Sequence, residues 1–180
     1  MIIGLSGYAQ SGKDEVAKIL IEEFGFERVA FADAIRDLLY LTNPILNELA
    51  GDIQHAVDHR GWDEIKQIPA VRKLLQNTGV AAREVLGKNV WVVAALRKME
   101  DDSKNYVITD VRFKNEASMI KYLGGVMWRI SRDGVTPVNS HISENELDDY
   151  KFNQILKNEG SLDDLRKLVR KRITVSLNAN

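Results

Sequence analysis

Seven residues near the start of the chain have the types and spacing of a phosphate-binding loop. They read Gly7-Tyr8-Ala9-Gln10-Ser11-Gly12-Lys13, with four residues between the two glycines and a lysine directly after the second. Glycines let backbone N–H groups turn toward phosphate oxygens, and a helix starting near Lys13 would direct its positive dipole end at them. The Lys13 ammonium can then reach the β- and γ-phosphates of a nucleotide. The residues that we expect to contact the nucleotide are Gly7, Ala9, Gln10, Ser11, Gly12, Lys13, Asp14 and Glu15.

Asp14 stands where such loops usually place a Ser or Thr hydroxyl on Mg²⁺. A carboxylate can bind Mg²⁺ directly or hold one of its water molecules, so Asp14 is our candidate metal ligand. The alternative is that Asp14 is an acidic residue of the first helical turn, where it interacts favourably with the helix dipole.

A second group of charged residues follows a short apolar run at Tyr106–Thr109. Asp110 lies at the carboxyl end of this predicted strand, where ligands of parallel sheets collect. Arg112 is suited to bidentate recognition of a phosphate, and Glu116 follows one helical turn later. We interpret Asp110 as similar to the acidic residue of a Walker B strand. An Asp110–Arg112 ion pair at a helix start is the structural alternative.

Further candidates lie on predicted helices and beside a polar loop. Arg72 and Gln76 are four residues apart on one helix face, which could hold a phosphate and a base edge, and Gly79 gives this stretch a tight end. Arg132 precedes the polar segment 133–149, where a closing lid would bring a cation onto transferring phosphates. Each arginine taken alone is more often a solvated surface residue.

The elements that must position these residues alternate between strands and helices. Apolar runs predict strands at Ile2–Ser6, Phe26–Phe31, Tyr106–Thr109, Val126–Ser131 and Phe152–Leu156. Helical periodicity covers Asp14–Phe24, about Asp33–Leu41, Ala70–Leu86, Asn89–Met99 and Glu116–Leu123, and Ser161 with Asp164 forms a capping-box signature for a last helix ending near Ile173. In Asn43–Pro69 we expect a short helix and a mobile loop. The alternation predicts a parallel α/β sheet.

Composition limits the classes of protein that the chain can be. It has 180 residues, 44% of them hydrophobic, a formal net charge of -1 and no cysteine. The near-neutral charge argues against a nucleic-acid polymer or an anionic membrane as partner. The absence of cysteine excludes disulfides, thiolate zinc sites and cysteine nucleophiles. No signal peptide and no apolar stretch of about 18 residues is present, so we expect one cytoplasmic domain without a membrane span.

The remaining histidines and tryptophans carry weaker signals. His55 and His59 are four residues apart, a spacing that can bind a metal, but no carboxylate motif surrounds them and a solvated helix is the simpler interpretation. His141 is a candidate lid or substrate contact, or part of a plain surface loop. Trp91 could stack on a base or belong to the core, and we expect Trp128 to pack in the core.

Together these residues resemble the deoxynucleoside monophosphate kinases of bacteriophages, within the P-loop nucleoside-monophosphate kinases. The resemblance spans nearly the whole chain. It is carried by Ser11-Gly12-Lys13-Asp14, Ala32-Asp33-Ala34-Ile35-Arg36, Arg72 to Gly79, Trp91, Asp110-Val111-Arg112 with Glu116, Arg132, Ser140-His141-Ile142-Ser143-Glu144 and Asn158-Glu159-Gly160-Ser161.

The resemblance implies a three-layer α/β/α P-loop NTPase fold with a mostly parallel sheet, in one domain covering residues 1–180. Residues 33–100 would be a helical acceptor-binding insertion and 133–149 a short lid. ATP would occupy the P-loop, with Asn158 and Gly160 beside its adenine and Mg²⁺ as cofactor. The implied acceptor-binding residues are Arg36, Arg72, Gln76, Gly79, Trp91, Asp110, Arg112 and Glu116.

The expected reaction is transfer of the γ-phosphoryl group of ATP to a deoxynucleoside 5′-monophosphate, with Lys13, Asp110, Arg112 and Arg132 as the catalytic residues. The location would be the host cytoplasm if the chain is phage-encoded, and a homodimer stays open. Two alternatives remain: another small-molecule P-loop kinase resembling dephospho-CoA kinase, and a non-catalytic nucleotide-binding switch.

Overall fold

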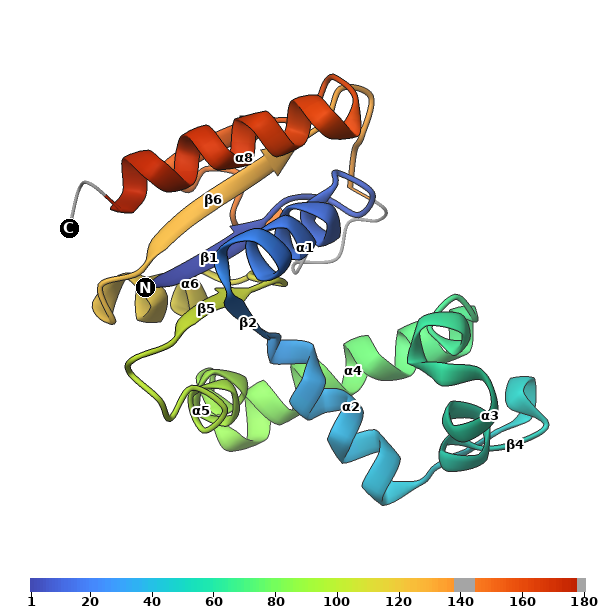
Figure 1. The fold of residues 1–180 in the computed structure, drawn as a ribbon. Helices are drawn as coiled ribbons and strands as arrows, with labels where there is room; N and C mark the ends of the chain where they lie inside the picture. The colour runs from blue at the N-terminus through green and yellow to red at the C-terminus, as the bar shows by residue number, and fades with distance from the viewer. Residues whose placement is uncertain (138–144, 178–180) are drawn as a thin grey trace. The chain divides into compact units, whose positions relative to one another are not determined.

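The computed structural model describes residues 1–137 and 145–177, and the chain forms two compact units (Figure 1). Unit 1 contains Met1–Ala30 and Lys98–Asn180, and unit 2 contains Phe31–Arg97. Unit 2 therefore enters the sequence between the second and third strands of the sheet that organises unit 1.

Unit 1 is built on a five-stranded sheet in which every neighbouring pair of strands is parallel. The strands are β1 (Ile2–Ser6), β2 (Phe26–Val29), β5 (Asn105–Ile108), β6 (Val126–Ser131) and β7 (Gln154–Lys157). Their spatial order is β2-β5-β1-β6-β7, so β1 is the central strand. All carboxyl ends lie at one edge, and the segments after β1 and β5 therefore leave the sheet at the same edge.

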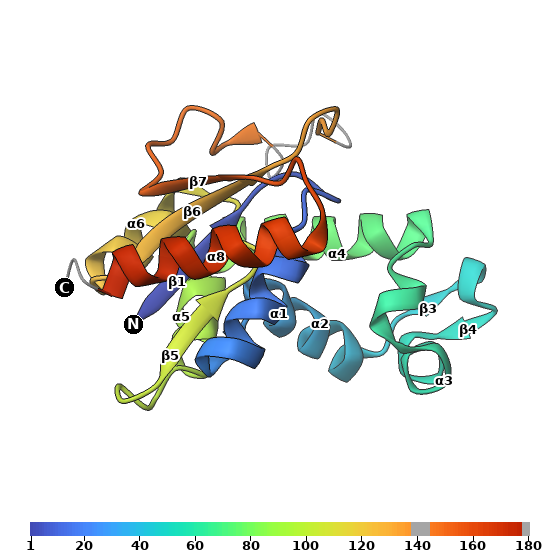
Figure 2. The ribbon, with the colours of Figure 1, turned by 45° about the horizontal axis from the view of Figure 1, so that its top comes forward.

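Helices cover both faces of this sheet and make unit 1 a three-layer structure. Helix α1 (Lys13–Phe24) and helix α8 (Leu162–Leu177) share one face, and Figure 2 shows α8 lying along β6 and β7. Helix α6 (Lys114–Tyr122) packs on the opposite face against β1 and β6. The predicted parallel α/β sheet is confirmed.

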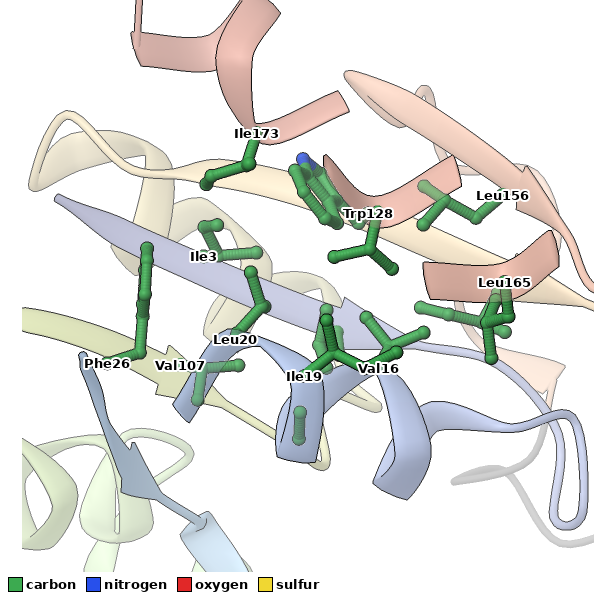
Figure 3. Packing of buried hydrophobic residues seen from close by; sticks show 14 residues of the cluster. Ile3, Val16, Ile19, Leu20, Phe26, Val107, Trp128, Leu156, Leu165 and Ile173 are labelled. Carbon is green, nitrogen blue, oxygen red and sulfur yellow. The ribbon is translucent and has the colours of Figure 1, made fainter. Parts of the chain in front are cut away.

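The core between the sheet and helices α1 and α8 is formed by aliphatic and aromatic side chains. Ile3, Leu20, Trp128 and Ile173 are each 0% exposed and belong to one cluster of buried side chains (Figure 3). Burying a side chain of this size contributes about 1.5–3 kcal/mol relative to an exposed one. Trp128 packs in the core as predicted.

Unit 2 is mainly helical. Its elements are α2 (Phe31–Thr42), β3 (Ile45–Leu46), the 3-10 helix η1 (Asn47–Leu49), β4 (Gly51–Asp52), α3 (Ile53–Ile65), α4 (Pro69–Leu86) and α5 (Val90–Leu96). Helix α2 contacts α3, α4 and α5, and β3 pairs with β4 in an antiparallel hairpin. Gly61 interrupts α3 with φ 74°.

The structure departs from the predicted elements mainly in the segment between Asn43 and Pro69. The expected short helix and loop are a small hairpin followed by α3, which is two helical pieces joined at Gly61. Two-residue strands and an interrupted helix carry no hydrophobic period long enough to recognise. The predicted capping box of the last helix is confirmed, because Ser161 N donates to Asp164 Oδ2 at 3.0 Å and Asp164 N donates to Ser161 Oγ at 3.3 Å.

Candidate active site

The loop between β1 and α1 has a backbone conformation that its glycines make accessible. Gly12 has φ 102° and begins α1, and a Cβ atom at this position would collide with the side-chain amide of Asn158. Gln10 also has a positive φ, of 65°. Because Gly12 has no side chain, no side-chain hydrogen bond caps the start of α1. The first N–H groups of a helix are free to bind an anion in such an arrangement.

Lys13 is folded over this loop. Its Nζ donates to the backbone oxygens of Gly7 and Tyr8, at 2.7 Å each. The cation is therefore held on the same loop whose N–H groups would surround phosphate oxygens. From this position Lys13 Nζ could donate to phosphate oxygens in place of the two carbonyl oxygens.

Asn158 joins the P-loop to the segment after β7. Its Nδ2 donates to the backbone oxygen of Ser11 at 3.0 Å, and its backbone N donates to the Ser131 oxygen at 2.8 Å. The hydroxyl of Ser11 is buried with no hydrogen-bond partner. Gly160 follows two residues later, where a Cβ would lie 2.8 Å from Asp164 Oδ2. The structure thus brings Asn158 to the loop, and adenine contact by Asn158 and Gly160 stays a prediction.

The carboxylates that could serve Mg²⁺ are few in the part of the chain that the structure describes. Asp14 is exposed in the first turn of α1 beside the half-buried Glu15, and Asp110 is half-buried after β5. Residues 1–137 and 145–177 contain no cluster of three or more His, Cys, Asp or Glu side chains suited to a metal. Mg²⁺ in phosphoryl-transfer sites is held by one or two carboxylates together with substrate phosphates and water, so this donor set fits.

The turn that carries Arg112 leaves the sheet beside the strand that leads into the P-loop. Val111 N donates to Leu5 O at 3.1 Å, which places Asp110 and Arg112 at the carboxyl end of the sheet. Glu116 is 3% exposed, and its Oε2 accepts from the backbone N of Arg112 at 2.8 Å and of Phe113 at 3.0 Å. Glu116 therefore holds the turn that presents the exposed Arg112.

Arg132 is exposed just beyond the end of β6. Of the segment expected to act as a lid, residues 138–144, with His141 among them, lie outside the described residues. The other parts of this segment belong to unit 1.

The remaining predicted residues lie in unit 2. Arg36 Nη1 is 3.7 Å from Asp33 Oδ1 on α2. Arg72 is exposed on α4 and donates to Gln67 Oε1 at 3.3 Å, and Gln76 is half-buried one turn further along α4.

Trp91 is only 6% exposed, and its Nε1 donates to the backbone oxygen of Gly79 at 2.9 Å. This bond fixes α5 against α4 and supports the packing interpretation of Trp91. Its contact with a base stays a prediction. The paired rings of His55 and His59 lie 4.1 Å apart on α3, without a third metal-ligating side chain among the described residues.

Sequence reasoning missed one feature beside the P-loop. Arg129 Nη2 lies 2.9 Å from Asp148 Oδ1, and Tyr8 Oη donates to the same oxygen at 2.8 Å. Burial and the hydrogen bond to Asp148 raise the pKa of the Tyr8 hydroxyl above its ordinary value of 10.0. The position of Tyr8 inside the phosphate-loop pattern was the available signal, but nothing in the sequence shows that residues 121 and 140 positions away meet there.

Comparison with known proteins is consistent with this geometry. The family model described as deoxynucleotide monophosphate kinase matches residues 52–169. The chain belongs to the deoxynucleotide monophosphate kinase family. The matched range begins in unit 2 and ends in α8, so the family model matches a part of the chain that does not include the P-loop.

Two viral relatives carry the same family name. A protein of Acanthamoeba polyphaga mimivirus named as a deoxynucleotide monophosphate kinase is 30% identical over 191 residues, covering 91% of each chain. The deoxynucleotide monophosphate kinase of Escherichia phage RB69 is 27% identical over 107 residues, which are 57% of this chain and 44% of the phage protein.

A solved structure supports the fold independently. Dephospho-CoA kinase from Campylobacter jejuni aligns with a TM-score of 0.52 and 15% identity, covering 96% of this chain and 95% of that one. With the phosphate loop between β1 and α1, this likeness confirms the predicted three-layer α/β/α P-loop fold of this family member. No helix in the described part of the chain is long and apolar enough to cross a membrane.

Proposed function

We propose that the protein transfers the γ-phosphoryl group of ATP to the 5′-phosphate of a deoxynucleoside monophosphate, giving ADP and the deoxynucleoside diphosphate. The observation that carries the proposal is the P-loop with Lys13 folded onto it, in a chain of the deoxynucleotide monophosphate kinase family. An oxygen of the acceptor phosphate forms the new bond to the γ-phosphorus, and the bond from that phosphorus to the β,γ-bridging oxygen breaks. The electron pair leaves on ADP.

The P-loop residues would hold the triphosphate of ATP. Backbone N–H groups of the loop and of the start of α1 would bind its oxygens, and Lys13 would exchange the Gly7 and Tyr8 carbonyls for the β- and γ-phosphates. The acceptor phosphate is already a nucleophile, so the protein's main contributions are alignment of the two phosphates and stabilisation of charge.

Mg²⁺ is the proposed cofactor, and Asp14 and Asp110 are the residues that would hold it, directly or through water. When bound, it would neutralise charge on the phosphate oxygens. If Asp14 does not contact the metal, its carboxylate still stabilises the start of α1.

Each unit by itself contains residues proposed for recognition of the acceptor. In unit 1 the proposed residues are Asp110, Arg112 and Glu116, the last acting through the turn that it holds. In unit 2 they are Arg36, Arg72, Gln76, Gly79 and Trp91. Arg132 would stabilise the transferring phosphoryl group, and segment 133–149 would exclude water as a lid.

The proposal is tested with a panel of deoxynucleoside monophosphates in the presence of ATP and Mg²⁺, and product diphosphates are separated by ion-exchange chromatography. We expect at least one deoxynucleotide to be phosphorylated in many turnovers. Dephospho-CoA serves as the control acceptor, because the likeness to dephospho-CoA kinase concerns the fold alone. A panel that yields only slow ATP hydrolysis, unaffected by any monophosphate, would instead support a nucleotide-binding switch.

A further inference from the structure

Tyr8, Arg129 and Asp148 form a compact side-chain group, the Tyr8 cluster, in which one carboxylate oxygen receives two hydrogen bonds. Asp148 Oδ1 accepts from the Tyr8 hydroxyl at 2.8 Å and from Arg129 Nη2 at 2.9 Å. The Arg129 guanidinium carbon also lies 4.7 Å from the centroid of the Tyr8 ring, within the range of a cation–π contact. The Tyr8 side chain is thus held at both its hydroxyl and its ring.

The sheet fixes the position of Arg129 in this cluster. Arg129 belongs to β6 and pairs in register with Ser6, the last residue of β1 and the one before Gly7. Its side chain is 15% exposed, and a second ring, that of Phe152, lies 5.6 Å from its guanidinium carbon. A cation between two rings and a carboxylate has little rotational freedom.

The residues on either side of Asp148 are fixed by packing and hydrogen bonds. Its neighbour Leu147 is 2% exposed. Glu146 Oε1 accepts from the backbone N of Lys114 at 2.9 Å, and Lys114 Nζ donates to Asp149 Oδ2 at 3.0 Å. These contacts attach the carboxyl-terminal end of segment 133–149 to the start of α6, so this end would stay in place when the rest of the proposed lid closes, and it gives Tyr8 an anchor within unit 1.

The cluster is connected to Lys13 through one backbone group. The Tyr8 carbonyl oxygen accepts from Lys13 Nζ at 2.7 Å, while the Tyr8 hydroxyl donates to Asp148. The Tyr8 hydroxyl is protonated at neutral pH even at its ordinary pKa of 10.0, and burial and this hydrogen bond raise that pKa further. We propose that Tyr8, held by Asp148 and Arg129, is a positioning residue that sets the P-loop backbone and thereby the direction of Lys13 toward the β-phosphate. This inference rests on the proposed binding of ATP at the loop.

The test is ADP binding, measured by calorimetry without acceptor, because Lys13 reaches the β-phosphate of a P-loop nucleotide. Tyr8→Phe removes one hydrogen-bonding hydroxyl and keeps the ring over which Arg129 lies. We expect the Kd for ADP to rise about three- to tenfold, the range for losing a single hydrogen bond. With ATP as substrate, kcat/KM for ATP should fall by a similar factor while KM for the acceptor stays constant.

Tyr40→Phe is the matched control. Tyr40 is half-buried like Tyr8 and also donates to an aspartate, Asp58 Oδ1, at 2.9 Å, but it belongs to α2 in unit 2. We expect ADP binding to be unchanged in this variant. An equal loss in both variants would indicate a general effect of removing a surface hydroxyl and would overturn the inference.

The variants of Asp148 separate positioning from fold stability. Asp148→Asn keeps an oxygen that can accept from Tyr8 and should bind ADP within about twofold of the parent, whereas Asp148→Ala should match Tyr8→Phe. The double variant Tyr8→Phe/Asp148→Ala should bind no more weakly than Asp148→Ala alone, because both changes remove the same bond.

The two proposals fail in different ways. If the parent protein binds ADP and Tyr8→Phe binds it equally well, Tyr8 is not a positioning residue, and the kinase proposal is unaffected. If the parent binds no ADP, the P-loop assignment itself is wrong, and both proposals fall. A loss of ADP affinity that follows the melting temperature of each variant would assign the cluster to folding alone.

Discussion

At the scale of single residues, local chemistry and burial assign different tasks to side chains of one motif. Lys13 extends over the P-loop backbone, while the hydroxyl of Ser11, two residues earlier, is buried without a hydrogen-bond partner. Glu116 is expected among the residues that contact the acceptor, but its carboxylate accepts hydrogen bonds from two backbone N–H groups. A residue can therefore serve recognition by shaping the turn from which a neighbour reaches the ligand.

Lys13→Ala should abolish most of the turnover and leave the fold intact. The lost ammonium would stabilise phosphate charge in the transition state, and removing one such electrostatic group typically lowers kcat about 100-fold or more. The change in the free energy of unfolding should stay near 1 kcal/mol or less, as measured by urea denaturation. Lys18→Ala, on the exposed part of α1, is the control. Full activity in Lys13→Ala would contradict the phosphate-cradle assignment.

Arg112→Ala should act on the acceptor rather than on ATP. A charge-assisted hydrogen bond contributes about 1.5–3 kcal/mol, so KM for the monophosphate should rise roughly 10- to 100-fold, with KM for ATP nearly constant. Arg166→Ala on α8 is the control, since Arg166 pairs at the surface with Asp163 at 3.4 Å. Steady-state kinetics with each substrate varied in turn measures the split, and unchanged acceptor kinetics would remove Arg112 from the site.

At the scale of elements, helix contacts decide which side chains are available to a ligand. Trp91 on α5 is buried and donates to the Gly79 oxygen on α4, the helix that also carries Arg72 and Gln76. Hydrophobic periodicity alone could not separate a stacking Trp from a core Trp, because both occur on amphipathic helices. Packing of α4 against α5 makes the distinction.

Trp91→Phe should destabilise unit 2 by about 1–3 kcal/mol, because the Gly79 oxygen loses its buried donor. Thermal unfolding followed by circular dichroism measures this loss. KM for the acceptor is the second readout: a value equal to that of the parent assigns Trp91 to packing, and a large rise assigns it a base contact as well. Unchanged thermal stability would contradict the role of the Trp91–Gly79 bond.

The contact between α1 and α8 predicts that the thermal stability of the protein depends on pH. Arg170 donates to Glu23 through Nε at 2.6 Å and Nη2 at 3.0 Å, which lowers the pKa of Glu23 below its ordinary value of 4.5. Because the pKa of Glu23 is lower in the folded state, the ion pair stabilises the protein at any pH above the ordinary pKa. This contribution is lost as the pH falls through the folded-state pKa. Arg170→Ala should therefore lower the melting temperature at pH 7 by a small amount that disappears in strong acid. A difference in melting temperature between Arg170→Ala and the parent that persists in strong acid would have to come from packing.

At the scale of the whole molecule, the proposed site residues are divided between two compact units. The P-loop, Asp110 and Arg112 belong to unit 1, and Arg36, Arg72 and Gln76 belong to unit 2. The chain is nearly neutral, with 25 Lys and Arg against 26 Asp and Glu. Near-neutrality excludes a global basic field but allows a few cations to serve small phosphorylated ligands.

Ligand binding should raise the stability of the whole protein. ATP with Mg²⁺ at 100 times its Kd should add about 2.7 kcal/mol to the free energy of unfolding, since it binds only the folded state. Removing Mg²⁺ with EDTA should reduce this gain, and Lys13→Ala should reduce it further. The measurement is the melting temperature against ATP concentration. An equal shift in the parent and in Lys13→Ala would place the nucleotide elsewhere.

The sequence by itself determined the features that depend on neighbouring residues. The P-loop could be recognised because a few consecutive residues set its backbone conformation and its charge, and the strands and helices of unit 1 could be predicted from short hydrophobic periods. The family assignment came from motifs of the same local kind and is shown by the comparisons.

Only the tertiary structure decided the contacts between residues far apart in the chain. Asn158 meets Ser11 across 147 positions, and Asp148 meets Tyr8 across 140. The physical reason is that β1, β6 and β7 are parallel neighbours in the strand order β2-β5-β1-β6-β7, so their carboxyl ends lie side by side although they are far apart in the sequence. The secondary-structure propensity of short segments does not determine the order of the strands. The strand order is set by which apolar faces pack together once the whole chain is folded.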